Sequence, residues 1–173
     1  SYSVTGVQTC ALPICVDDLM PKAAALADEG PVEIYQDDTF FSCPDGRLKL
    51  RAFTNTEGEL IFYRRPDGNA PRESFYVRSE TVEPDSLREC LSLAYGQAGR
   101  VVKHRTLFLA GRTRIHLDRV EGLGHFLELE VVLDECESPE NGVREALDLM
   151  ERLGVNESRS EERRVGKECR SRW

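Results

Sequence analysis

Segment 101–133 constrains the fold of this chain most strongly, because polar and apolar residues alternate along it in successive runs. Its last run, 126–133 (FLELEVVL), puts the leucines on one side and Glu128 and Glu130 on the other. A period of two residues is typical of a half-buried β-strand. The preceding residues 121–124 (EGLG) have the composition of a turn. The segment therefore predicts three neighbouring strands.

Each of these three strands carries charged side chains along one face, mainly basic in the first two and acidic in the third. If the three charged stripes share one face of a sheet, that face suits a multivalent anion bound together with a metal ion. The residues are Lys103 and Arg105 in the first strand, Arg112, Arg114, His116 and Asp118 in the second, and Glu128 and Glu130 in the third.

Composition narrows the class of protein. A chain of 173 residues with 40% hydrophobic content is long enough for one domain with a substantial core. A net charge of −8 argues against a general nucleic-acid binder. The six cysteines show neither a C-x-x-C pair nor metal-ligand spacing, which argues against a zinc site and a disulfide framework. Without a membrane-length apolar run or a recognisable signal peptide, we expect a cytoplasmic protein with no membrane partner.

The rest of the chain adds helices and further strands. Helical spacing of apolar residues predicts helices over 16–29, 84–97 and 139–153, the last with Ser138 as its N-cap and Gly154 just after its end. Their expected inner faces include Leu87, Leu91 and Ala94 or Tyr95 in the second helix, and Leu147, Met150 and Leu153 in the third. Alternation and turn residues predict strands over 32–41, 47–53, 59–65 and 74–80.

In several of these strands, apolar residues alternate with cations. An ordinary sandwich, in which the cations face solvent, is one explanation. The other is a closed barrel whose apolar residues face outward against helices, so that the cations point into one lumen. Repulsion and desolvation would make that lumen costly unless a polyphosphate filled it. The cations are Lys49, Arg51, Arg64, Arg78, Lys103, Arg105 and Arg114.

An ordered set of short motifs resembles the CYTH superfamily, which groups class IV adenylate cyclases and thiamine triphosphatases, also called triphosphate tunnel metalloenzymes. The resemblance covers about residues 16–157. It implies an α+β fold built on an eight-stranded antiparallel β-barrel with flanking helices, whose inner wall binds a triphosphate and a divalent metal ion. The motifs are DDTFF, GRLKLR, the K-x-R of Lys103 and Arg105, TRIHLD and EGLGHFLELE.

The resemblance also implies roles for individual residues. Lys49, Arg51, Arg64, Lys103, Arg105 and Arg114 match positions that grip phosphate oxygens, and Arg78 is a looser match. Lys103 and Arg105 are in addition the expected catalytic pair. Arg64 stands where many members have lysine, which changes the donor geometry. Glu128 and Glu130, with Asp118, are the expected ligands of Mg²⁺ or Mn²⁺.

The chain departs from the family at its ends. The family signature, an E-x-E-x-K strand near the N-terminus, does not occur. Residues 3–14 and 160–173 instead resemble the conceptual translation of a sequencing-adapter oligonucleotide. We therefore expect tails of non-native character over 1–14 and 159–173, and a domain over 15–158 that is truncated at both ends and lacks its N-terminal strand.

By this resemblance the chain cleaves ATP, thiamine triphosphate or inorganic triphosphate with the help of a metal ion. Hydrolysis and cyclisation need the same cation clamp, so both stay open. The absent E-x-E-x-K motif leaves a polyphosphate-binding module without turnover as an alternative, and a β-rich interaction domain is a third possibility. His104 is expected on the face opposite Lys103 and Arg105, whereas His116 is an open candidate for proton transfer.

Overall fold

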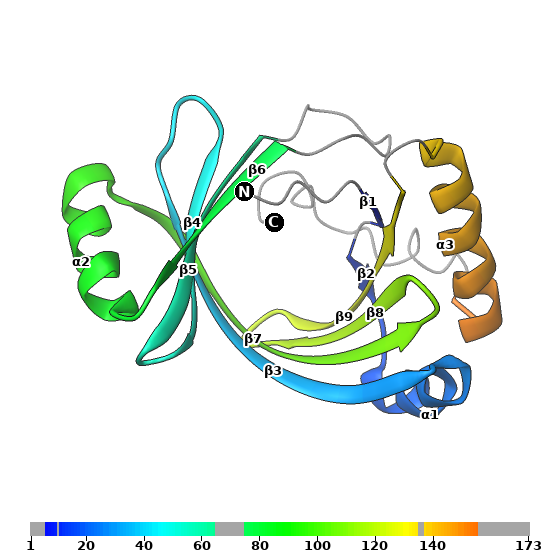
Figure 1. Cartoon of the computed structure of the whole chain (residues 1–173). Helices are drawn as coiled ribbons and strands as arrows, with labels where there is room; N and C mark the ends of the chain where they lie inside the picture. The colour runs from blue at the N-terminus through cyan, green and yellow to red at the C-terminus, as the bar shows by residue number, and fades with distance from the viewer. Residues whose placement is uncertain (1–5, 10, 65–74, 135–136, 156–173) are drawn as a thin grey trace.

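The computed structural model describes residues 6–9, 11–64, 75–134 and 137–155, which form one strongly curved sheet with three helices on its outside (Figure 1). The strands are β1 (Gly6–Gln8), β2 (Leu12–Pro13), β3 (Glu29–Phe41), β4 (Arg47–Thr54), β5 (Glu57–Arg64), β6 (Phe75–Thr81), β7 (Gln97–Ala110), β8 (Thr113–Val120) and β9 (Gly124–Val132); the helices are α1 (Val16–Leu26), α2 (Pro84–Tyr95) and α3 (Pro139–Leu153).

The sheet is antiparallel throughout, and its strand order is β1-β9-β8-β7-β3-β4-β5-β6, with β2 also paired to β9. The predicted α+β fold with an antiparallel tunnel and flanking helices is confirmed. The predicted closure of the barrel is not, because β1 and β6 end the sheet without pairing with each other among the described residues. The sheet is thus a curled, open tunnel (Figure 1).

The predicted strands and helices all occur, but bounds differ by a few residues at the start of β7, which begins at Gln97 instead of residue 101, and between α1 and β3. The helix ends at Leu26, and β3 already begins at Glu29 instead of residue 32. The reason is pairing with β7: the backbone N–H of Asp28 donates to the Leu109 carbonyl at 2.7 Å, and Glu29 is opposite Leu109. These backbone groups are satisfied by the sheet, so continuing the helix would gain nothing.

The hydrophobic core lies outside the tunnel, between the outer face of the sheet and helices α1 and α3. Its α3 residues recur at helical spacing, which gives this helix one apolar face. The prediction for Leu147 was wrong, because this side chain is 49% exposed and Leu149 is buried in its place. The core consists of Val7, Val16, Leu19, Ala23, Phe108, Ile115, Leu117, Leu127, Leu129, Val131, Leu133, Ala146, Leu149, Met150 and Leu153.

Helix α2 contacts β3, β4 and β5 on the outer side through a smaller and more polar interface. Leu87 and Leu91 are partly buried, but Ala94 and Tyr95 are exposed, so the predicted inner face ends one turn early. Arg88 anchors the helix: its Nε donates to Thr39 Oγ1 at 3.0 Å and its Nη2 to Asp37 Oδ2 at 3.2 Å.

Residues 6–8 and 12–13, which we expected to stand outside the fold, pair with β9. Val7 is opposite Val131 and is buried in the core. A strand edge presents unpaired backbone N–H and C=O groups, which an extended segment can satisfy whatever its side-chain pattern. The absence of alternation in this segment therefore did not exclude it from the sheet.

No helix among the described residues has both the length and the apolar character that crossing a membrane requires.

Candidate functional site

Most of the predicted site residues of the central strands lie on one face of the sheet, which we call the lumen face. Side chains directly opposite each other in neighbouring strands point to the same side. The lumen face is opposite the core face, because the residues that alternate with its members are those buried against α1 and α3. The opposed pairs that define it are Asp38 and Arg51, Gln36 and Lys103, Arg105 and Asp118, His116 and Glu128, and Arg114 and Glu130.

Asp118 organises a first cluster with the Lys-x-Arg pair of β7. Lys103 Nζ donates to Asp118 Oδ2 at 2.7 Å, while Arg105 donates through Nε to Oδ1 at 2.7 Å and through Nη2 to Oδ2 at 2.8 Å. All three residues are buried. Burial alone would raise the pKa of the Asp118 carboxyl, but Arg105 and Lys103 outweigh it and lower that pKa. Burial and the neighbouring Arg105 lower the pKa of Lys103.

Asp38 organises a second cluster with the Lys-x-Arg pair of β4. Lys49 Nζ donates to Asp38 Oδ2 at 2.8 Å, and Arg51 donates through Nε and Nη2 to the two carboxylate oxygens at 2.7 Å each. Burial opposes ionisation of Asp38, yet Lys49 and Arg51 hold the pKa of its carboxyl well below the usual range. Burial and the adjacent Arg51 lower the pKa of Lys49 to about 8.

Aromatic rings flank this second cluster. The Nζ atom of Lys49 lies 5.7 Å from the ring centroid of Phe40 and 5.9 Å from that of Tyr63. A cation at this distance from an aromatic ring is attracted by the ring quadrupole. The rings therefore help to hold the ammonium group in place.

The two glutamates of β9 form the acidic part of the lumen face, around His116. Arg105 Nη2 lies 3.6 Å from Glu128 Oε2, and Arg114 Nη1 donates to Glu130 Oε2 at 3.1 Å. Burial would raise the pKa of Glu128, but His116 and Arg105 outweigh it and lower that pKa to about 2. Burial lowers the pKa of His116. Its Nδ1 lies 3.9 Å from Glu128 Oε1, and its Nε2 lies 4.0 Å from Glu130 Oε2.

Two predicted phosphate-binding residues lie apart from these clusters. Arg78 is on the lumen face, opposite Ile61, but its side chain is 51% exposed and forms an ion pair with Glu59 at 3.4 Å. Arg64 is on the other face: its Nε donates to the Asp45 carbonyl at 2.9 Å and its guanidinium lies over the Phe62 ring. The structure therefore does not bring Arg64 together with the other cations.

His104 lies on the outer face, as its phase in β7 predicted. Its ring meets that of Tyr35 edge-on, with 5.2 Å between the centroids. It has no place in the candidate site.

The predicted metal ligands are only partly brought together. Asp118 is occupied by Lys103 and Arg105, and the described residues contain no group of three or more histidine, cysteine or acidic side chains that could hold a metal ion. Glu128 and Glu130 remain as two carboxylates on one face of β9. Such a donor pair fits Mg²⁺, which is commonly bound through one or two carboxylates together with substrate phosphates.

The edge strand β1 supplies no carboxylate next to this pair. Its register puts Gln8, a neutral amide, opposite Glu130. The E-x-E-x-K strand that the family resemblance implied would have placed acidic residues near the N-terminus.

Sequence reasoning missed Asp38, Gln36 and Tyr63 as members of the lumen face. The signal for Asp38 was present in the DDTFF motif, but that motif has an aspartate in both phases of the alternation. Asp37 points to the outer face, where Arg88 and Arg100 both bind it. Arg100 donates through Nε to Asp37 Oδ1 at 2.8 Å and through Nη2 to Asp37 Oδ2 at 2.6 Å. Only the pairing of β3 with its neighbours β4 and β7 identifies Asp38 as the inward one.

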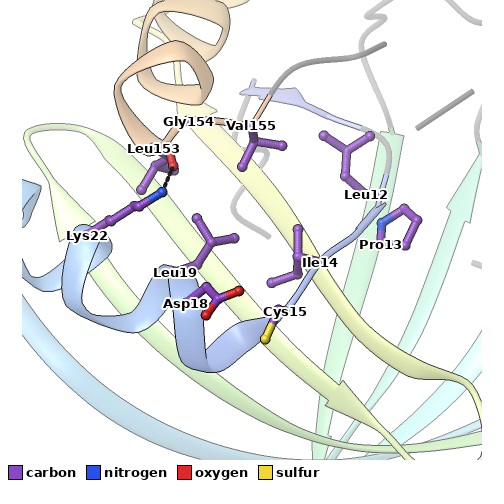
Figure 2. A pocket seen from close by; sticks show the side chains of 10 residues that line it. All are labelled: Leu12, Pro13, Ile14, Cys15, Asp18, Leu19, Lys22, Leu153, Gly154 and Val155. Carbon is purple, nitrogen blue, oxygen red and sulfur yellow. Dashed lines mark hydrogen bonds between the residues drawn. The ribbon is translucent and has the colours of Figure 1, made fainter. Parts of the chain in front are cut away.

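A small cavity of about 160 Å³ lies elsewhere, where β2, α1 and the end of α3 meet. Figure 2 shows its lining, including Lys22, whose Nζ donates to the Leu153 carbonyl at 3.2 Å. None of its lining residues is a predicted site residue. The cavity is therefore separate from the lumen face.

Comparison with known proteins finds a matching family model, a relative in sequence and similar solved structures. The CYTH domain model matches residues 16–164. Adenylate cyclase CyaB from Aeromonas hydrophila is 26% identical over 158 residues, covering 86% of this chain and 80% of that protein. A structure of a protein from Pyrococcus horikoshii has a TM-score of 0.76 at 24% identity, covering 90% of this chain and 92% of that one. An adenylyl cyclase candidate from Hippeastrum with a dominant triphosphatase activity has a TM-score of 0.61 at 16% identity, covering 87% of each chain.

Proposed function

Because the chain belongs to the CYTH family, we propose that it binds a triphosphate on the lumen face and cleaves it with the help of a divalent metal ion. The observation that carries this proposal is the pair of clusters, the half-buried Lys49-x-Arg51 with Asp38 and the buried Lys103-x-Arg105 with Asp118. Each cluster contains two cations and one carboxylate and so by itself has a net positive charge, although Glu128 adds a carboxylate 3.6 Å from Arg105 beside the cluster of Asp118. Two such centres on one face suit a chain of phosphates better than a single anion.

The carboxylates have a second effect, on the geometry of the donors. An arginine that donates through Nε and Nη2 to one carboxylate is held in a fixed plane, as Arg51 and Arg105 are. A donor array fixed before the ligand arrives does not have to reorganise during the reaction. The clusters would therefore orient the phosphates as well as attract them.

In the proposed reaction the cations neutralise the charge that develops on the transferring and leaving oxygens. In hydrolysis, a water oxygen bonds to the terminal phosphorus, the bond to the bridging oxygen breaks, and phosphate, diphosphate and a proton are released. In cyclisation, the ribose 3′-oxygen bonds to the α-phosphorus, and diphosphate and a proton leave. Glu128 and Glu130 would hold the metal ion, which when bound acts as a Lewis acid on the phosphate oxygens.

The substrate class follows from the chemistry of the site and from the relatives. ATP, thiamine triphosphate and inorganic triphosphate share the phosphate chain that the clusters would bind. The names of the Aeromonas and Hippeastrum relatives point to cyclase and triphosphatase activities, respectively. We therefore propose both reactions as candidates for this chain.

A second candidate is a triphosphate-binding module without turnover. It is favoured by the neutral Gln8 opposite Glu130 and by the lack of a three-carboxylate group among the residues the structure describes. With fewer metal ligands the clusters could still bind phosphates.

The experiment that tests both candidates incubates the whole chain with each of the three triphosphates and Mg²⁺ or Mn²⁺. Phosphate, diphosphate and cyclic AMP are followed, and binding is measured by calorimetry. The Glu128→Gln/Glu130→Gln variant is compared with Glu140→Gln, an exposed residue of α3. Product lost only in the double variant supports the enzyme, binding without product supports the module, and the absence of binding contradicts both.

A further inference from the structure

Gln36 is a buried lumen-face residue that the ion-pair clusters do not use. Its side chain is 4% exposed, and Oε1 has no hydrogen-bond partner among the described residues. Lys103 is directly opposite Gln36 in the pairing of β3 with β7, but its Nζ donates to Asp118 at 2.7 Å. His116 Nδ1 is likewise without a hydrogen bond, but it lies against Glu128 in the acidic part of the site.

The position of Gln36 places it between the two clusters. Asp38 follows two residues later on the same face of β3, with Lys49 and Arg51 beyond it on β4. On the other side of Gln36, Lys103 lies on β7 and Asp118 on β8, the strand after it. A phosphate chain that engaged both clusters would pass the carboxamide of Gln36.

The chemistry of the unpaired atom limits what it can contact. A buried acceptor without a donor costs free energy, and such atoms are rare in folded proteins unless a ligand or water satisfies them. An amide oxygen accepts hydrogen bonds, and so do ionised phosphate oxygens, so these two groups have no reason to pair. Its partner is therefore either an O–H or N–H donor or a metal ion. The expected metal ligands, Glu128 and Glu130, lie on β9, which β8 and β7 separate from β3, and this position favours the O–H or N–H donor.

We propose that Gln36 contacts the ligand complex, its Oε1 accepting a hydrogen bond from a hydroxyl group bound beside the phosphate chain. The hydroxyl belongs either to a water molecule or to the sugar of an organic triphosphate, and both present the same donor. Gln36 thereby positions an oxygen nucleophile or selects a hydroxylated substrate. The inference rests on the proposed function, because it needs a triphosphate on the lumen face.

The test compares Gln36→Leu with Gln97→Leu in the whole chain. Gln97 is an exposed glutamine at the start of β7, and its Nε2 donates to Ser92 Oγ at 2.7 Å. Because leucine removes a buried unpaired acceptor, Gln36→Leu should raise the Tm of the ligand-free protein by about 2 °C or more. The same variant should weaken ATP binding or turnover at least about fivefold, whereas Gln97→Leu should change neither quantity by as much as twofold.

Two ligands separate the sources of the hydroxyl. If a sugar hydroxyl is the donor, Gln36→Leu weakens binding of ATP but not of inorganic triphosphate, and wild-type protein binds 3′-deoxy- or 2′-deoxy-ATP as weakly as the variant binds ATP. If water is the donor, the variant loses turnover with both ligands at unchanged KM. Either pattern supports the proposal.

A third variant, Gln36→Met, is uncharged and has nearly the same length but no amide, so it should lose as much function as Gln36→Leu. Retained function in Gln36→Met would show that the carboxamide makes no contact with the ligand and would overturn the proposal. So would a lower Tm for Gln36→Leu, which would reveal a structural hydrogen bond, or unchanged binding and turnover. Wild-type protein that binds neither ligand would instead refute the proposed function itself.

Discussion

Asp38 and Asp118 occupy equivalent positions in the two clusters: each accepts three hydrogen bonds from a lysine and an arginine spaced two residues apart on the neighbouring strand. Asp38 precedes its Lys-x-Arg strand in the chain, whereas Asp118 follows its own. The same local charge arrangement is thus built twice, with the order of its parts reversed. This equivalence makes the two aspartates comparable in experiments.

Replacing Asp118 by asparagine should destabilise the protein, because Lys103 and Arg105 would lose the buried charge that compensates them. Breaking one partner of a buried ion pair costs about 3 kcal/mol or more, and urea unfolding monitored by circular dichroism measures it. Added triphosphate should restore part of the loss, since its oxygens supply negative charge. Asp17→Asn is the matched control, because the ion pair of Asp17 with Arg119 is exposed at the surface and should leave stability unchanged.

Arg51 and Arg64 differ in the face that they occupy, and binding should report that difference. Arg51→Ala should weaken triphosphate binding roughly tenfold or more, because it removes a charge-assisted contact. Arg64→Ala should leave the Kd within about twofold. Isothermal titration calorimetry at fixed salt compares the two variants. A comparable loss in Arg64→Ala would contradict the position of Arg64 outside the lumen face.

Triphosphate affinity should fall as the pH rises above about 8, the lowered pKa of Lys49. Above that pH the Lys49 ammonium group of the free protein loses its proton. Because the phosphate oxygens bind the charged form of Lys49, the affinity for triphosphate falls by up to about tenfold per pH unit. Stability moves the other way: between pH 8 and 10.5 the unfolded lysine keeps its proton longer than the folded one, so this group makes folding more favourable as the pH rises.

Lys49→Arg tests the assignment of this pH dependence, because arginine stays charged throughout the range. The variant should bind triphosphate with a flatter profile between pH 8 and 10 than wild type. An unchanged slope would assign the titration to Lys103, whose pKa is also lowered by burial and by Arg105. Lys22→Arg, on α1 outside the lumen face, is the control.

Core substitutions should show that apolar packing on the outer face of the sheet contributes to stability. Leu129→Ala removes a fully buried side chain and should lower the free energy of unfolding by about 2–5 kcal/mol. Leu147→Ala, on the exposed side of α3, should change it by less than about 0.5 kcal/mol. Chemical denaturation of both variants makes the comparison, and similar losses would contradict the observed phase of α3.

The fold could be predicted well because the alternation of apolar and polar residues along a strand shows which of its side chains are buried. In β8 and β9 one face is apolar and the other charged, so the phase of each strand was unambiguous and the Lys-x-Arg pair of β7 was assigned to the correct side. Arg64 was predicted to share the lumen face with the other cations, both from the strand pattern and from the family resemblance. In β5 it has the same phase as Leu60 and Phe62, and the structure places it with them on the outer face.

The remainder depends on contacts between distant parts of the chain. In β3, polar side chains point to both faces of the sheet. Asp37 faces α2 and binds Arg88 and Arg100. Asp38 points to the lumen face and binds Lys49 and Arg51. No local pattern separates the two aspartates. Closure of the barrel depends likewise on whether the two edge strands pair with each other. Alternation within one strand carries no information on that pairing.

The location of the core outside the tunnel bears on how such a protein can change over evolution. In most globular domains a substitution in the interior disturbs the packing that maintains the fold. Here apolar packing involves α1, α3 and the outer face of β8 and β9, while the ligand-facing side chains occupy the other face of the same strands. Selection can therefore replace tunnel residues outside the two ion-pair clusters singly and retain the apolar core, which lets one architecture acquire new substrates in small steps.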